Sequence, residues 1–237
     1  MNIYTDRVIN KKFNNAISAN IQKFSQEYRV LAILKYLFPD EHANLKPSDN
    51  PDLQNDKNNY AIEVTITASQ EQMQANREFT HLCNEKDTES QKKIKEKIEN
   101  NGYNIIESDY GKIMDCSWRN ILFEERIFKE AIRKKLEKVN NYREHFPTIG
   151  LAILWIDRPT TEASEKIIDW IKECEKTCGQ KGYDFYYILT QDSVIYYDTK
   201  DNSESIHHLS SMDARYLSTI GRMTAENEIS LSDVEWN

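Results

Sequence analysis

The segment Lys46–Thr67 reads KPSDNPDLQNDKNNYAIEVTIT, and its second half is the clearest strand in the chain. From Ile62 onward apolar side chains alternate with polar ones, a period of two that is typical of a half-buried strand. One face carries Ile62, Val64 and Ile66, and the other carries Glu63, Thr65 and Thr67. A carboxylate inside a β-branched run needs a cation, a metal or water as its partner. Glu63 is therefore a candidate site residue.

A second short strand precedes this one. Pro51-Asp52 opens it, and the polar cluster at 55–59 is typical of the turn between two strands. In such a hairpin Asp52 and Glu63 can lie side by side at the end of a sheet. Two converging carboxylates are the ligands that a hard divalent cation, most often Mg²⁺, takes from proteins. Asp49, on the same proline-rich segment, is a reserve ligand.

The composition favours a packed domain with long helices. Of 237 residues, 39% are hydrophobic and 30% are charged, and the mean hydropathy is −0.75. Only 6 glycines and 5 prolines are present, too few for a sandwich of short turns. No apolar run has the length that spans a bilayer, and residues 1–20 contain no apolar signal-peptide core. We therefore expect a cytoplasmic protein without a membrane partner.

Charge and cysteine content limit the functional classes. A net charge of −8 is unlike that of a general nucleic-acid binder, but the segment 129–138 is locally basic. The four cysteines predict reduced thiols, and a zinc site at Cys174 and Cys178 is a minor alternative because two further ligands at matching spacing are absent from the sequence nearby.

Periodicity and turn residues predict alternating helices and strands. The first helix runs from Ser25, its N-cap, to Phe38 and is ended by Pro39. Two prolines in Leu45–Leu53 confine the short strands there to a sheet edge or a strand start. Further elements are expected as follows: a helix capped by Ser69, weak strands at Tyr103–Ile106 and Tyr110–Met114, the longest helix at about Trp118–Tyr142, a helix from Thr161 that ends at Gly179 or Gly182, a hairpin or two edge strands within Phe185–Thr199, and a final helix at Met212–Glu228.

Two other segments bear on the organisation of the chain. The continuous apolar run Gly150–Ile156, ended by Asp157-Arg158-Pro159, predicts a central, parallel strand covered on both faces. The segment Asn84–Asn101 is almost wholly charged or amide, which predicts an exposed helix or an insertion. Residues 1–24 are expected to form an N-terminal arm or helix.

At Pro51-Asp52 and Glu63-Val64-Thr65 the chain resembles the PD-(D/E)XK nuclease superfamily, which has the restriction-endonuclease-like fold. The predicted order of elements is also similar to the αβββαβ core of that family, over about 25–157. The resemblance implies an α/β fold: a single domain (1–237) with a central mixed sheet flanked by helices, an insertion at about 84–117, and a C-terminal β/α extension from 158 to 237. Thr65 occupies the place of the family's lysine.

The resemblance also implies roles for individual residues. Asp52 and Glu63 would hold Mg²⁺ or Mn²⁺ together with the backbone carbonyl of Val64, and Thr65 would lie in the catalytic centre. Glu27 has two interpretations: an acid favoured near a helix N-terminus, or the acidic residue that members often carry on the first helix.

In some branches of the superfamily the lysine has moved to the second core helix. Lys135 and Lys138 are three residues apart in that predicted helix and therefore share a face. Either is a candidate replacement, and the alternative is that both belong to the solvated side of the helix. Lys129, Arg133 and Lys134 are candidate nucleic-acid contacts.

Taken together, these residues predict a metal-dependent endonuclease that cleaves DNA, with RNA as an open alternative. By analogy with the family, it would be a component of prokaryotic or phage defence, acting as a homodimer or in a larger complex. Two other hypotheses remain. The chain could be a catalytically inactive nuclease-like binding module, or a partner-binding protein of unrelated α/β fold in which Asp52 and Glu63 are loop and surface acids.

Overall fold

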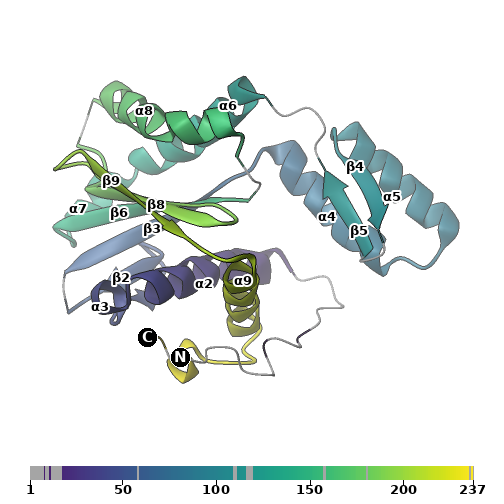
Figure 1. Ribbon diagram of the computed structural model, residues 1–237, viewed down its shortest axis with the longest axis horizontal. Coiled ribbons are helices and arrows are strands. Elements are labelled where there is room, and N and C mark those ends of the chain that lie inside the picture. Colours follow the sequence, from purple (N-terminus) through teal and green to yellow (C-terminus); the bar gives the residue numbers. More distant parts are fainter. Residues whose placement is uncertain are drawn as a thin grey trace.

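The computed structural model describes most of the chain, namely residues 8, 11, 18–57, 59–108, 111–115, 120–156, 159–179, 181–234 and 236. Most of the predicted N-terminal arm lies outside these residues, as do Cys116, Trp118, Asp157 and Arg158. The structure confirms an α/β fold with an open mixed sheet of seven strands flanked by helices (Figure 1).

The sheet has the strand order β1-β2-β3-β6-β7-β8-β9. Strand β3 pairs in parallel with β6, which pairs in parallel with β7, and the other neighbours are antiparallel. The strands are β1 (Lys46–Pro47), β2 (Leu53–Asn55), β3 (Tyr60–Thr67), β6 (Thr148–Trp155), β7 (Phe185–Leu189), β8 (Ser193–Asp198) and β9 (Ser203–His208). The predicted central, parallel strand is therefore confirmed as β6, and the proline-containing β1 lies at an edge.

Helices cover both faces of this sheet (Figure 1). On one face lie α2 (Ala19–Leu37) and α9 (Ser211–Ala225), with the short α3 (Pro39–His42) beside them. On the other face lie α6 (Ile121–Leu136), α7 (Val139–Arg143) and α8 (Thr161–Cys178). A single turn of 3₁₀ helix (Leu231–Asp233) follows α9. Among the described helices, none has both the length and the apolar character that crossing a bilayer requires.

The alternation predicted for β3 is correct, but the strand is not half-buried. Ile62 and Val64 pack into the apolar cluster beneath α2 and α9. Ala61 packs into the cluster beneath α6 and α8, and Glu63 on that same face is only 3% exposed. Because helices lie on both faces, Glu63 is held in the interior rather than on a solvated surface.

Two helix boundaries differ from the prediction. Helix α2 begins at Ala19, where the Ser18 hydroxyl accepts a hydrogen bond from the N–H of Ile21, so Ser25 is not the N-cap and Glu27 is not in the first turn. The helix predicted to be longest is divided into α6 and α7 by a turn at Glu137 and Lys138, and its 16-residue first part is shorter than the 19 residues of α2. The buried apolar pattern continues through the turn, which hides the break from a periodicity argument.

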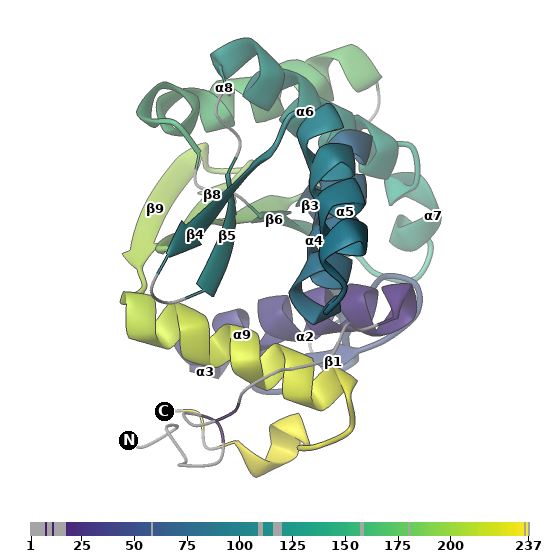
Figure 2. The same ribbon diagram turned by 90° about the vertical axis from the view of Figure 1, so that its right-hand side faces the viewer.

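The insertion between β3 and α6 forms a separate appendage (Figures 1 and 2). It consists of α4 (Gln70–Asn84), α5 (Thr88–Asn100) and a hairpin of β4 (Asn104–Ser108) and β5 (Gly111–Asp115). Its own small apolar cluster is centred on Ala75, Leu82, Ile98 and Tyr103. The appendage thus begins with α4, earlier than residue 84.

The C-terminal extension agrees with the prediction except at one strand. Helix α8 ends at Gly179 with φ of 68°, β7 and β8 form the predicted antiparallel hairpin, and α9 is the predicted final helix. Strand β9, with the sequence SESIHH, was not predicted. Its side chains are almost all exposed, so it lacks the buried apolar alternation that reveals a strand.

The contact between α2 and α9 gives a test of the fold. A Cβ added at Gly221 would lie 2.7 Å from the backbone N of Arg29 and 2.9 Å from the carbonyl O of Ser25. Because backbone atoms cannot move aside as a flexible side chain does, we expect Gly221→Ala to lower the free energy of unfolding by about 1–3 kcal/mol. The exposed Arg215→Ala on the same helix is the control, with a change within about 0.5 kcal/mol. Equal urea midpoints for the two variants would contradict this packing.

Candidate active site

Asp52 and Glu63 are brought together by the hairpin of β2 and β3. Leu53 pairs with Ile62 in the antiparallel register, so the next position in the same register places Asp52 opposite Glu63. Both carboxylates are buried, with exposed fractions of 6% and 3%. Asp52 Oδ2 accepts a hydrogen bond from the backbone N–H of Val64 at 2.8 Å, which fixes its side chain against β3.

Lys135 reaches this acid pair from the last turn of α6. Its Nζ lies 2.5 Å from Glu63 Oε1 and 3.9 Å from Asp52 Oδ2. Neighbouring α6 residues Ile132 and Leu136 pack against the sheet, which directs Lys135 toward β3. The lysine side chain keeps a 20% exposed fraction, so solvent reaches the ion pair from this side.

Lys138 does not share this position. It follows the end of α6 and precedes the first residue of α7, and its side chain is exposed. The expectation that Lys135 and Lys138 lie on one helical face is wrong, because the helix is interrupted between them. Among the described residues, only Lys135 forms an ion pair with Asp52 or Glu63.

Glu27 approaches the same acids from the opposite face of the sheet edge, on α2. It is 6% exposed and forms an ion pair with Lys23, one helical turn earlier, at 3.3 Å. The negative charge of Glu27 contributes to the raised pKa of Asp52. The pKa of Lys23 is also raised, mainly by the charge of Glu27 and to a smaller extent by the charges of Asp52 and Glu63. Three carboxylates and two ammonium groups therefore share one electrostatic neighbourhood.

The site holds more negative charge than its surroundings neutralise. Burial raises the pKa of Asp52 to about 6, and the charge of Glu63 acts in the same direction, against the opposing effects of Lys135 and the Val64 N–H. Burial and the charge of Glu63 also raise the pKa of Tyr142, on α7. Glu63 Oε2 is buried and has no hydrogen bond of good geometry among the described residues, although the Tyr142 hydroxyl lies close enough to the Glu63 carboxylate to interact with it. A carboxylate oxygen in this condition is suited to receive a further cation.

The other predicted site residues differ in their burial and in their contacts. Thr65 is partly buried on the strand face that carries Glu63, whereas Asp49 is exposed in the bend that precedes Asp52. Arg133 and Lys134 are exposed on α6. Lys129 is 8% exposed and forms ion pairs with Glu125 and Glu173, which link α6 to α8. The prediction that Lys129 contacts nucleic acid does not agree with this position, because two carboxylates already neutralise its charge.

Lys23 and Tyr183 were missed by the sequence reasoning. Lys23 lies four residues before Glu27, a spacing that would indicate an ion pair had the helix been predicted to start at Ala19. The Tyr183 hydroxyl donates a hydrogen bond to the carbonyl of Lys135 at 2.9 Å and so fixes the end of α6. No local sequence signal indicates that contact, which spans 48 residues.

The capacity of the site for a metal rests on few protein ligands. Within the described ranges, no group of three or more His, Cys, Asp or Glu side chains is arranged to hold a metal ion. Two carboxylates and one backbone carbonyl are available instead. Because the N–H and C=O of one residue point to the same edge of a strand, the Val64 carbonyl faces the side on which its N–H meets Asp52.

Comparisons with protein-family models, with curated protein sequences and with solved structures found no significant match to this chain. Its function is therefore inferred from its own residues. Among these, the acid pair with Lys135 combines burial, a perturbed carboxyl pKa and a specific charge partner, the features that mark candidate functional sites.

The raised pKa of Asp52 predicts a pH-dependent stability. A folded-state pKa near 6, above the usual carboxyl value, means that the folded chain keeps a proton that the unfolded chain releases. The wild type should therefore lose stability as the pH rises from about 4 to about 6, and the loss persists at higher pH. Asp52→Asn should be more stable than wild type by about 1–3 kcal/mol at about pH 8 and equal to it near pH 4. Urea unfolding at both pH values measures this, and a variant less stable at pH 8 would contradict it.

The ion pair of Lys135 predicts a difference between two nearby lysines. Lys135→Met leaves Glu63 buried without its cation, so we expect unfolding to be easier by about 1–3 kcal/mol near neutral pH. The matched exposed change Lys138→Met should remain within about 0.5 kcal/mol of wild type. Chemical denaturation of the three proteins compares them. Equal losses in both variants would show that Lys135 is not the buried partner.

Proposed function

We propose that this chain is a divalent-metal-dependent nuclease that hydrolyses phosphodiester bonds in DNA. The observation that carries the proposal is the buried pair Asp52–Glu63 with Lys135 reaching it from α6. The ammonium group of Lys135 supplies the positive charge that the neutral Thr65 on β3 does not. The arrangement matches the role expected of a lysine that has moved from the strand to the second core helix.

The order of the elements supports a restriction-endonuclease-like core. Helix α2 and the short α3 are followed by β1, β2 and β3, then by the appendage, and then by α6, the short α7 and β6. Apart from the short α3 and α7, this order is similar to αβββαβ with an insertion before the second core helix, which supports the proposal. Glu27 on α2 also lies near the acid pair, as expected of the accessory acid on the first helix.

The residues present fit Mg²⁺ or Mn²⁺. All available donors are oxygens: the carboxylates of Asp52 and Glu63 and the backbone carbonyl of Val64. Magnesium commonly takes one or two carboxylates from the protein and completes its shell with water and phosphate oxygens. The buried Oε2 of Glu63 and the excess of negative charge are the features that such an ion would satisfy. A bound metal supplies a Lewis acid that acidifies water and stabilises charge on the phosphate in the transition state.

The side chains of this protein would position the phosphate and the attacking water and would neutralise negative charge on the phosphate. The ammonium group of Lys135 can donate to a non-bridging phosphate oxygen or to the attacking water while it keeps its contact with Glu63. Lys23, whose side chain is 66% exposed beside the acids, is a candidate contact for the negative backbone of a nucleic acid. Arg133 and Lys134 are further exposed cations on α6.

A second candidate is a nuclease-like module that binds without cleaving. Thr65 in the lysine position and the net charge of −8 favour it. In this case the ion pair of Lys135 with Glu63 would be a structural feature that closes the site. Turnover and metal binding, measured separately, distinguish the two candidates.

The deciding experiment is cleavage of supercoiled plasmid DNA with Mg²⁺ or Mn²⁺. We expect nicking or linearisation by wild type and a loss of at least about 100-fold for Asp52→Asn, Glu63→Gln and Lys135→Ala, because each removes a group that acts on the reacting phosphate. Lys138→Ala is the matched control and should retain activity. Single-stranded RNA in parallel reactions tests the alternative substrate.

Metal binding is measured on the same proteins by calorimetry and thermal unfolding. Stabilisation of wild type by Mn²⁺ that Glu63→Gln abolishes, together with no cleavage of any nucleic acid, would favour the inactive module. If wild type showed neither metal binding nor cleavage, the assignment of the site would be overturned. Cleavage that survives in Asp52→Asn and Glu63→Gln would do the same, because the activity would then come from other residues or from a contaminant.

A further inference from the structure

Strand β9 forms the edge of the sheet opposite the candidate active site. It pairs with β8 over six residues in continuous antiparallel register, and none of the described strands pairs with its outer side. Proteins usually protect such edges with proline, lysine or a bulge. The sequence SESIHH has neither residue, its register has no bulge, and Ile206 is 56% exposed at its centre.

The backbone of β9 presents hydrogen-bonding groups outward at alternate residues. The N–H of Leu209 donates to the carbonyl of Asp192, which lies just before β8, at 2.8 Å. In an antiparallel pair, both backbone groups of every second residue point to the same neighbour. The N–H and C=O of Glu204, Ile206 and His208 therefore point away from β8, toward the open edge.

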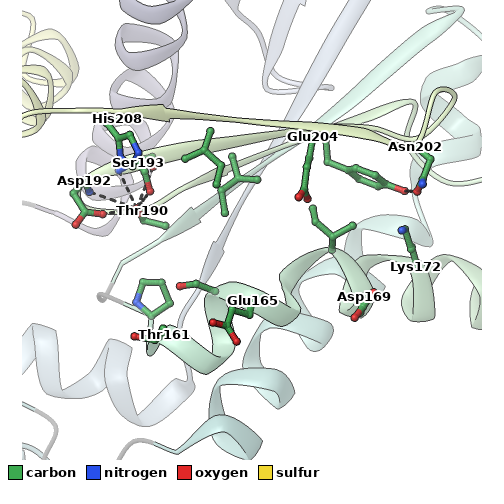
Figure 3. Close-up of a pocket in the computed structure, with 16 residues that line it drawn as sticks. Thr161, Glu165, Asp169, Lys172, Thr190, Asp192, Ser193, Asn202, Glu204 and His208 are labelled. Atoms are coloured by element: carbon green, nitrogen blue, oxygen red, sulfur yellow. Dashed lines mark hydrogen bonds between the residues drawn. The ribbon is translucent and has the colours of Figure 1, made fainter.

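The side chains of these three residues share one face. Figure 3 shows Glu204 and His208 extending from β9, with Glu165 and Asp169 of α8 across from them. Together with Ile206, these residues line a groove of about 820 Å³. The opposite face of the strand carries Ser205 and His207, whose Oγ and Nε2 are 3.0 Å apart. The edge thus offers an apolar centre with an acid on one side and an imidazole on the other.

We propose that β9 pairs in antiparallel fashion with β9 of a second copy of this chain, across a two-fold axis at Ile206. This interface would join the two sheets into one. The occupant is a second copy because the sequence of β9 is complementary to itself in this register. Ile206 faces Ile206 of the partner subunit, and Glu204 faces an imidazole of the partner at each end of the pair.

The register follows from the pleat. A register shift of one residue would place side chains of opposite faces against each other, so only registers that differ by two residues keep like faces together. Moving the two-fold axis by one residue along β9 changes the register by two. Moving the axis to Ser205 places Ile206 opposite a glutamate, and moving it to His207 places Ile206 opposite an imidazole. Only the axis at Ile206 pairs apolar with apolar and acid with imidazole, and it also brings the outward backbone groups of Ile206 against each other.

The interface does not depend on the proposed chemistry. Strand β9 is separated from β3 by β8, β7 and β6, so pairing at this edge does not involve the strand that carries Glu63. The oligomeric state can therefore be measured whether or not the chain cleaves nucleic acid.

Sedimentation velocity over a range of protein concentrations tests the proposal. We expect wild type to form a dimer and His208→Glu to weaken it at least about tenfold, because two pairs of like charges then face each other. Ile206→Lys should dissociate the dimer. The exposed Glu96→His, on α5 of the appendage, is the control and should behave as wild type. Circular dichroism checks that each variant is folded.

Complementary variants make the test specific to this register. Glu204→His alone should also weaken the dimer, but an equimolar mixture of His208→Glu and Glu204→His should form a heterodimer, because every acid again faces an imidazole. The double variant should form a homodimer for the same reason. A monomeric wild type at all concentrations would overturn the proposal. A dimer that Ile206→Lys leaves intact, or a mixture that fails to associate, would also overturn it.

Discussion

The burial of two carboxylates beside one ammonium group is the constraint on which the candidate site depends. Asp52 and Glu63 are almost fully removed from solvent, and such ions are costly unless they are paired. Lys135 offsets part of this cost through its contact with Glu63, and the Val64 N–H offsets part through Asp52. The remaining imbalance appears as the raised pKa of Asp52. This imbalance lowers the stability of the fold at neutral pH, and a bound cation would reduce it.

Both faces of the sheet contribute to holding this arrangement. Helix α6 carries Lys135 on one side, and α2 carries Glu27 on the other. The end of α6 is fixed by the hydroxyl of Tyr183, which precedes β7. The site is thus assembled from elements distributed along the chain, and its geometry depends on the packing of α2 and α6 against the sheet.

The parts of this site that could be predicted from the sequence are those set by local pattern. The alternation in β3 and the turn after β2 are sufficient to place Asp52 beside Glu63. The sequence could not show that Lys135 rather than Lys138 contacts the acids, because the buried apolar pattern continues through the turn that separates α6 from α7. The pairing of Lys129 with Glu173 was equally hidden, since it depends on how α8 packs against α6. At the opposite edge, β9 carried too few buried residues to be recognised as a strand.

The place of the appendage between Glu63 and Lys135 has a consequence for how the length of this chain can vary. These two residues are 72 positions apart, and the chain between them includes all of α4, α5, β4 and β5. The entropy lost on closing a loop grows only with the logarithm of its length, by about 0.6 kcal/mol for each doubling. The appendage also has its own apolar cluster. Lengthening, shortening or replacing the appendage therefore costs the ion pair little.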